Sequence, residues 1–203
     1  MHHMNSASQR IQPLYEAFYI ESMQFNCQSA VRSIARVSGV FKQLPSPSTL
    51  EDIEALPSQK ILNELQNLVV QGAALSRYFW PVRKGHEGRA EHLKEAFSVT
   101  ESSSLYDRNL RNAIEHFDER LDKYLGSGIL GCIFPEFVGP RPAEDGIAGH
   151  FFRAYFTDAG IFRLLDEDYP VEPLANEILR LHEMLDFMSS QGGRFVVNGS
   201  HDA

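Results

Sequence analysis

Cysteine is scarce in this chain, which has Cys27 and Cys132 among its 203 residues. Two cysteines so far apart match neither a disulfide framework nor the short spacing of a zinc site, so we interpret both as free thiols buried as small hydrophobic side chains. Long apolar runs are also missing, since no stretch approaches the roughly 20 apolar residues of a transmembrane helix. Residues 1–6 lack the apolar segment of a signal peptide. These absences predict a cytoplasmic protein with no membrane partner.

Positive charge is in deficit. The sequence has 27 Asp and Glu residues against 19 Lys and Arg residues, which gives a formal net charge of −8. Strong non-specific binding to nucleic acid needs a basic surface, and the overall balance does not favour one, although charge can be concentrated on a single face. Hydrophobic residues make up 43%, as is typical of a globular chain that buries a core without disulfides or metals.

Apolar residues recur at intervals of three and four along most of the chain, which predicts a mainly α fold, specifically a helical bundle. Proline and serine mark expected helix ends: Pro13 suits a first turn, Pro45 stops a helix, and Ser58 is a candidate N-cap. A short turn is expected over 50–56. The expected helices run from Pro13 to Pro45, from the Ser58 cap to Pro81, and over about 87–97, 105–125 and 172–190.

The character of the sequence changes after residue 125. Residues 126–149 are rich in glycine and proline and predict a loop. Over about 150–168, aromatic residues precede Asp158-Ala159-Gly160 and an apolar segment follows it, which predicts a small β-hairpin. We therefore expect a helical bundle over 10–125. A loop, a hairpin and a C-terminal helix over 126–191 should pack on the same domain.

The stretch Leu110-Arg111-Asn112-Ala113-Ile114-Glu115-His116 carries the chemically suggestive pattern of the sequence. It resembles the signature of the HEPN superfamily (higher eukaryotes and prokaryotes nucleotide-binding domains), in which an Arg, often followed by Asn, precedes a His on a late helix of a helical bundle. Arg111, Asn112 and His116 match that signature, and the helical layout fits over about 10–125. On the expected helix 105–125, an apolar stripe predicts an inward and an exposed side. The inward residues should be Leu110, Ile114, Phe117 and Leu121, and the exposed ones Arg108, Glu115 and Glu119.

The resemblance implies a metal-independent endoribonuclease without a cofactor, in which two copies of the motif meet across a homodimer. It also allows an inactive relative that binds RNA or a nucleotide. In such chemistry the RNA 2′-OH is the nucleophile, and His116 can move the proton because an ordinary histidine titrates near neutral pH. Arg111 can stabilise charge on the phosphate through its planar guanidinium, and Asn112 can orient the histidine or the phosphate.

Helix geometry places a condition on this assignment. In a straight helix Asn112 and His116 are neighbours, but Arg111 projects ~140° away from His116. A bend, or the motif of a second subunit, is needed to bring Arg111 and His116 together.

The alternative is a non-catalytic helical interaction module in which the motif is structural. Arg111 would then pair with Asp107 or Glu115 on the helix surface, and His116 would be a boundary residue that bonds to Asn112. Acidic residues around His116 would repel phosphate unless nearby arginines dominate. These acidic residues are Glu115, Asp118, Glu119 and Asp122.

No set of side chains has the spacing of a metal site. His86 and His92 are six residues apart and point in different directions on a helix, while His182 and Asp186 supply too few ligands. We therefore predict no structural metal.

Overall fold

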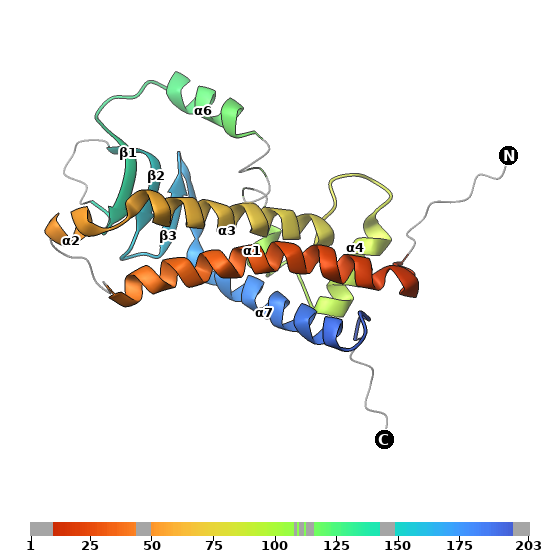
Figure 1. Ribbon diagram of the computed structural model, residues 1–203. Coiled ribbons are helices and arrows are strands. Elements are labelled where there is room, and N and C mark those ends of the chain that lie inside the picture. The colour runs from red at the N-terminus through yellow and green to blue at the C-terminus, as the bar shows by residue number, and fades with distance from the viewer. Residues whose placement is uncertain are drawn as a thin grey trace.

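The computed structural model describes residues 10–43, 50–107, 109, 112, 116–142 and 149–196. The protein is mainly α-helical, with a small mixed β-sheet beside one end of the long helices (Figure 1). None of the helices in these ranges combines the length and apolar character of a membrane span. In chain order the elements are η1 (Pro13–Tyr15, a 3₁₀ turn), α1 (Glu16–Gln43), α2 (Leu50–Ala55), α3 (Ser58–Phe79), α4 (Glu87–Phe97), η2 (Ser104–Tyr106, a 3₁₀ turn), α6 (Phe117–Gly126), β1 (Cys132–Gly139), β2 (Gly149–Phe156), β3 (Ile161–Leu164), β4 (Glu167–Pro170) and α7 (Val171–Ser190).

The three long helices form one layer, in which α1 runs between α3 and α7 (Figure 1). Each helix buries the apolar stripe that its three- and four-residue spacing predicts. On α7 the buried apolar residues are Leu174, Ala175, Ile178, Leu181, Leu185 and Met188. Hydrophobic burial along these stripes is the main force that holds the helices together.

Most helix boundaries match the sequence signals. η1 begins at Pro13, α1 ends at Gln43 before Pro45, and α4 covers the expected 87–97. The N-cap prediction for Ser58 was wrong. Pro57 occupies the cap position, its carbonyl accepts the first helical hydrogen bond from Ile61 at 3.0 Å, and Ser58 already belongs to the helix.

The sheet contains more strands than the predicted hairpin. β2 and β3 form the expected antiparallel pair around residues 157–160, and β4 extends it in antiparallel fashion. The strand order is β1-β2-β3-β4, and β1 pairs with β2 in parallel. Gly160 takes a left-handed conformation with φ of 63° in the β2–β3 turn, which a glycine adopts without steric cost.

The expectation of a loop throughout 126–149 was wrong, because β1 occupies residues 132–139 of that segment. β1 is an edge strand and contains Pro135. A proline cannot donate a ladder hydrogen bond, so it is tolerated at an edge and obscures the strand in the sequence.

Helices and sheet share one hydrophobic core. Val138, Phe162 and Tyr169 from the sheet belong to the same buried cluster as Ile20 and Leu65 from the helices. Arg153 on β2 also donates a 2.7 Å hydrogen bond to the side chain of Gln66 on α3. Residues before and after position 125 therefore depend on each other for burial.

The two cysteines lie in different environments. Cys27 is fully buried in α1, and burial, followed by the charge of Asp186, raises the pKa of its thiol to about 12. Cys132 is exposed at the start of β1, so the expectation that it is buried was wrong.

Candidate functional site

The expected motif helix does not continue through His116. The backbone at His116 has φ of −135° and ψ of 33°, and this residue occupies the N-cap position of α6. The single helix predicted over 105–125 is therefore wrong at this point, because His116 is not in helical geometry and α6 begins at Phe117. Asn112 is helical and exposed. Arg111 lies outside the described residues.

The imidazole of His116 faces solvent beside a carboxylate. Its side chain is 53% exposed, and its Nδ1 lies 3.4 Å from Oε2 of Glu119 one turn later in α6. An acidic neighbour at this distance can hold the ring in one orientation. His116 and Glu119 thus form an accessible pair that could transfer protons.

α6 stands apart from the long helices and is attached through the sheet (Figure 1). None of its residues, all of which the structure describes, is fully buried. The Phe117 ring meets Phe152 edge-on at 5.8 Å, and the Tyr124 hydroxyl lies 3.0 Å from Nδ1 of His150. These contacts between side chains fix α6 against β2.

The predicted inward stripe of the motif helix is only half-buried in its described part. Phe117 and Leu121 are partly buried, and Glu119 is exposed as expected. The other residues of that prediction, Leu110, Ile114, Arg108 and Glu115, lie outside the described residues.

Arg120 is tied into the sheet by acidic side chains. Its guanidinium lies 3.0 Å from Glu167 and 3.6 Å from Asp166, and its side chain is 18% exposed. Burial lowers the pKa of Arg120, but its hydrogen bond to Tyr169 and the charges around it outweigh burial and raise the pKa above its ordinary value. Arg120 is therefore permanently charged. Its charge pairs with Glu167 and Asp166, which holds α6 to the sheet, and does not balance the carboxylates around His116.

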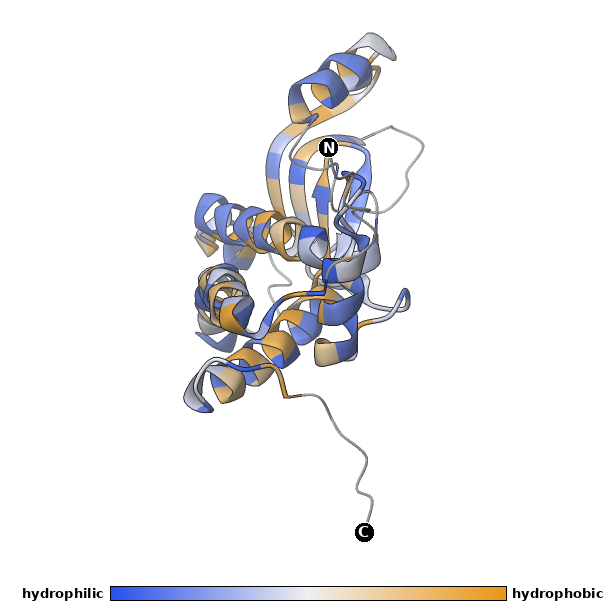
Figure 2. Ribbon diagram, turned by 90° about the vertical axis from the view of Figure 1, so that its right-hand side faces the viewer, coloured by the Kyte–Doolittle hydropathy of each residue, from blue (hydrophilic) through white to orange (hydrophobic). Residues whose placement is uncertain are grey.

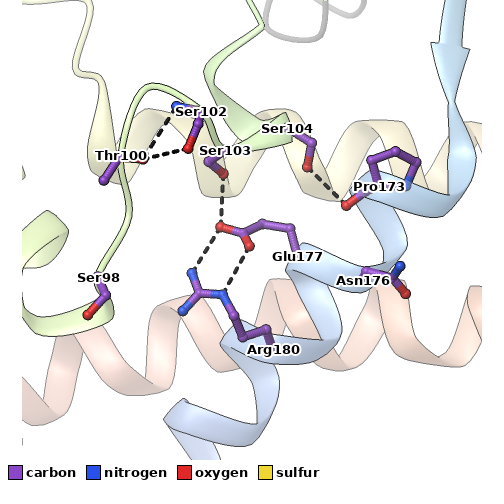
Figure 3. Close-up of a pocket in the computed structure, with 9 residues that line it drawn as sticks. All are labelled: Ser98, Thr100, Ser102, Ser103, Ser104, Pro173, Asn176, Glu177 and Arg180. Atoms are coloured by element: carbon purple, nitrogen blue, oxygen red, sulfur yellow. Dashed lines mark hydrogen bonds and ion pairs between the residues drawn. The ribbon is translucent and has the colours of Figure 1, made fainter.

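A second candidate site is the pocket between residues 98–104 and the first turns of α7 (Figure 3). Its volume is about 650 Å³. Ser103 and Arg180 converge on the carboxylate of Glu177, at 2.8 Å from Ser103 and at 2.9 and 3.0 Å from Arg180. Because Glu177 balances the one arginine of the lining, the pocket offers hydroxyl groups but little net charge to a ligand. The hydroxyl-bearing residues are Ser98, Thr100, Ser102, Ser103 and Ser104.

The ion pair in this pocket also joins three parts of the chain. Arg180 donates a 2.8 Å hydrogen bond to the carbonyl of Phe97 at the end of α4, while Ser104 donates to the carbonyl of Pro173 at 3.1 Å. Sequence reasoning missed this arrangement. The i, i+3 spacing of Glu177 and Arg180 indicates the pair, but nothing in the sequence indicates that Ser103 joins it. A structural role, holding α4 to α7, accounts for these contacts.

Glu177→Gln should destabilise the protein by about 1–3 kcal/mol at pH 7, the range for hydrogen bonds to charged groups. Burial raises the pKa of Glu177, but the hydrogen bonds from Arg180 and Ser103 and the charge of Arg180 outweigh it, so the pKa lies below its ordinary value of 4.5. A depressed pKa contributes stability that is fully present above the ordinary value and is lost as pH falls through the folded-state value. Urea unfolding from pH 7 to pH 3 should therefore show the difference from wild type shrinking with acid.

The matched control for this experiment is Glu172→Gln, since Glu172 is an exposed residue of the same helix. It should change stability little at any pH. A Glu177→Gln difference that stays constant across the pH range would contradict the assignment.

Among the described residues, no group of three or more His, Cys, Asp and Glu side chains could hold a metal ion. His182 and Asp186 lie 3.3 Å apart on α7, as their spacing predicts, and form a simple pair. Comparison of the chain with protein-family models, with curated proteins and with solved structures found no match. The assignment of a function therefore rests on the residues themselves.

Proposed function

We propose that this protein is a HEPN-like, metal-independent endoribonuclease of the cytoplasm, in which Arg111, Asn112 and His116 carry the chemistry. In this proposal the helical bundle spans 10–125 and contains α1, α3, α4 and the motif segment, and the sheet and α7 pack on it. Two copies would meet with their motif segments at or near the interface. The observation that carries the proposal is the accessible His116 beside Glu119 at a break in the helix.

The break removes a geometric objection to the motif. In one straight helix Arg111 and His116 would project ~140° apart and could not act on the same phosphate. Because the backbone turns at His116, the direction of its side chain is no longer fixed by the helix that contains Asn112. The straight-helix objection therefore does not apply to Arg111 and His116.

The proposed reaction follows from these residue types. His116 takes the proton from the RNA 2′-OH, and that oxygen attacks the adjacent phosphorus. The bond from phosphorus to the 5′-oxygen of the next nucleotide breaks, and this oxygen takes a proton back from the imidazolium and leaves as a 5′-hydroxyl. The product is a 2′,3′-cyclic phosphate. Arg111 stabilises the negative charge that develops on the phosphate, and Glu119 orients the imidazole. No step needs a metal, because the substrate supplies the nucleophile.

The direct test is cleavage of single-stranded RNA by the purified protein, with and without EDTA. Cutting should persist in chelator and leave cyclic phosphate or 3′-phosphate ends. A substrate with a deoxyribose at the cut position should resist cleavage there, because it lacks the 2′-OH. Cleavage of this deoxyribose substrate, or complete loss of activity in EDTA, would refute the mechanism.

A second candidate function is a non-catalytic interaction module. The observation that favours it is the surface around α6 and the edge strand, where Leu125, Leu130 and Ile133 are 52%, 83% and 63% exposed. Figure 2 shows that α6 mixes hydrophobic and hydrophilic residues. Two results together would support this candidate over the first: the wild-type protein cuts no RNA, and Leu130→Asp abolishes binding of a partner protein.

A further inference from the structure

One ridge of α1 faces away from the protein. The opposite side of the helix is fully buried at Ile20 and Met23, where α1 lies between α3 and α7 (Figure 1). On the outer side Phe18 and Phe25 of α1 are each 72% exposed, and Leu14 of the preceding turn η1 is 79% exposed. Large apolar side chains gathered on one exposed ridge mark an interaction surface, unlike apolar residues scattered singly.

The outer residues follow a heptad spacing. Intervals of four and three residues alternate along the ridge, which is the a/d spacing of helices that pair in coiled coils. Every position is exposed except Gly39, which is half-buried. Here "the α1 ridge" means Leu14, Phe18, Glu21, Phe25, Gln28, Arg32, Ala35 and Gly39.

We propose that the α1 ridge binds the α1 ridge of a second copy of this chain in antiparallel orientation. The register that sets Glu21 opposite Arg32 of the second copy also sets each large apolar residue opposite a small or flexible one. These layers are Phe18 with Ala35, Leu14 with Gly39, and Phe25 with Gln28. A two-fold axis repeats every layer, so the surface is complementary to itself.

Charge selects this orientation and register. The side chains of Glu21 and Arg32 make no ion pair or hydrogen bond within the part of the chain that the structure describes. A parallel pair would set each of these charges against its own copy. Sliding the antiparallel pair by a heptad would set Glu21 against Phe25 in one direction and against Gly39 in the other, and both slides separate Glu21 from Arg32. Charged and polar residues at core positions fix register and orientation in coiled coils in this way.

The small residues provide the space that the pairing needs. A Cβ atom added at Gly39 would meet nothing within 4 Å, so Leu14 of the second copy can lie over this position. Ala35 leaves comparable room for Phe18. The α1 ridge is separate from the motif segment, so this interface is independent of the one that the proposed function expects.

The test is the oligomeric state of the full chain at about 10–50 µM, the range of ordinary micromolar association, measured by analytical ultracentrifugation. Wild type should be at least dimeric, and a tetramer where the independent motif-segment interface of the proposed function forms as well. Glu21→Arg sets arginine against Arg32, Arg32→Glu sets glutamate against Glu21, and each should raise the dimer Kd by roughly tenfold or more. The double exchange of Glu21→Arg with Arg32→Glu should restore wild-type association.

Mixing the two single variants provides the sharpest version of the experiment. In a mixed pair every charged layer again joins an arginine to a glutamate, so the mixture should form heterodimers although each variant alone is weakened. Phe25→Ser should also weaken association, while Val82→Ser, which changes an apolar residue 75% exposed outside the ridge, should not.

Three results would overturn the inference: a monomeric wild type, a dimer indifferent to the single charge reversals, or a double variant and a mixture that both fail to associate. Indifference to the reversals would leave a dimer through the motif segment intact. The failure of this inference is therefore distinguishable from the failure of the proposed function.

Discussion

Replacing His116 with alanine should lower the rate of RNA cleavage by about 10²–10⁴-fold, the usual loss for a group that transfers protons in the transition state. The fold should survive, because the imidazole is 53% exposed and its described ion-pair contact is with Glu119. The measurement is single-turnover cleavage at saturating enzyme, accompanied by far-ultraviolet circular dichroism. An alanine variant as active as wild type would eliminate His116 as the catalytic group.

The matched control is His86→Ala, which removes another exposed histidine, before α4, without touching the motif. Its cleavage rate should equal that of wild type.

Arg111→Ala should also abolish most cleavage, and Arg111→Lys should restore it only in part, because lysine lacks the planar guanidinium that contacts two phosphate oxygens. In the alternative, structural interpretation, Arg111→Ala changes stability by less than ~1 kcal/mol, as for an exposed ion pair.

Much of the helical layer could be predicted because its signals are local. The stripe of α7 and the ends of α4 follow from apolar spacing within a few turns. The parallel pairing of β1 with β2 does not, because it joins residues whose contact depends on the whole fold, and Pro135 hides the strand. The break at His116 was missed for a different reason. Ile114, Phe117 and Leu121 continue the helical period across it, and the sequence there has neither proline nor glycine.

In the candidate sites too, the sequence predicts local features but not the contacts that depend on the whole fold. Sequence alone predicts Arg111, Asn112 and His116 as site residues, and it indicates acidic neighbours such as Glu119. It did not indicate that Arg120 would be held by Glu167 and Asp166, because these residues reach it only after β3 and β4 fold. The charge available near His116 therefore depends on tertiary contacts. Spacing along α1 does reveal the α1 ridge, but only its exposure in the fold distinguishes the ridge from a second buried face.

Phe97→Ala should lower the free energy of unfolding by about 3–5 kcal/mol, the usual cost of removing a fully buried phenylalanine. Phe97 is 0% exposed at the end of α4, and its ring meets Phe79 edge-on at 6.1 Å and Phe195 at 5.9 Å. The cavity would also release Phe195, whose amide donates to Glu16 at 3.0 Å, so the C-terminal segment should loosen from α1.

The measurement is urea unfolding at one fixed protein concentration, since any dimer would make apparent stability depend on concentration. Phe187→Ala is the matched control, because it makes the same change at a side chain that is 55% exposed and should cost about 1 kcal/mol or less. Hydrogen exchange should report the consequence at the other end of the chain. Amides of residues 191–196 should lose protection in Phe97→Ala and keep it in Phe187→Ala. A loss of about 3–5 kcal/mol is a large share of the roughly 5–15 kcal/mol that stabilises a typical domain, so the difference between the variants should be easy to measure. Equal stability of the two variants would mean that α4 and the C-terminal segment do not share the core.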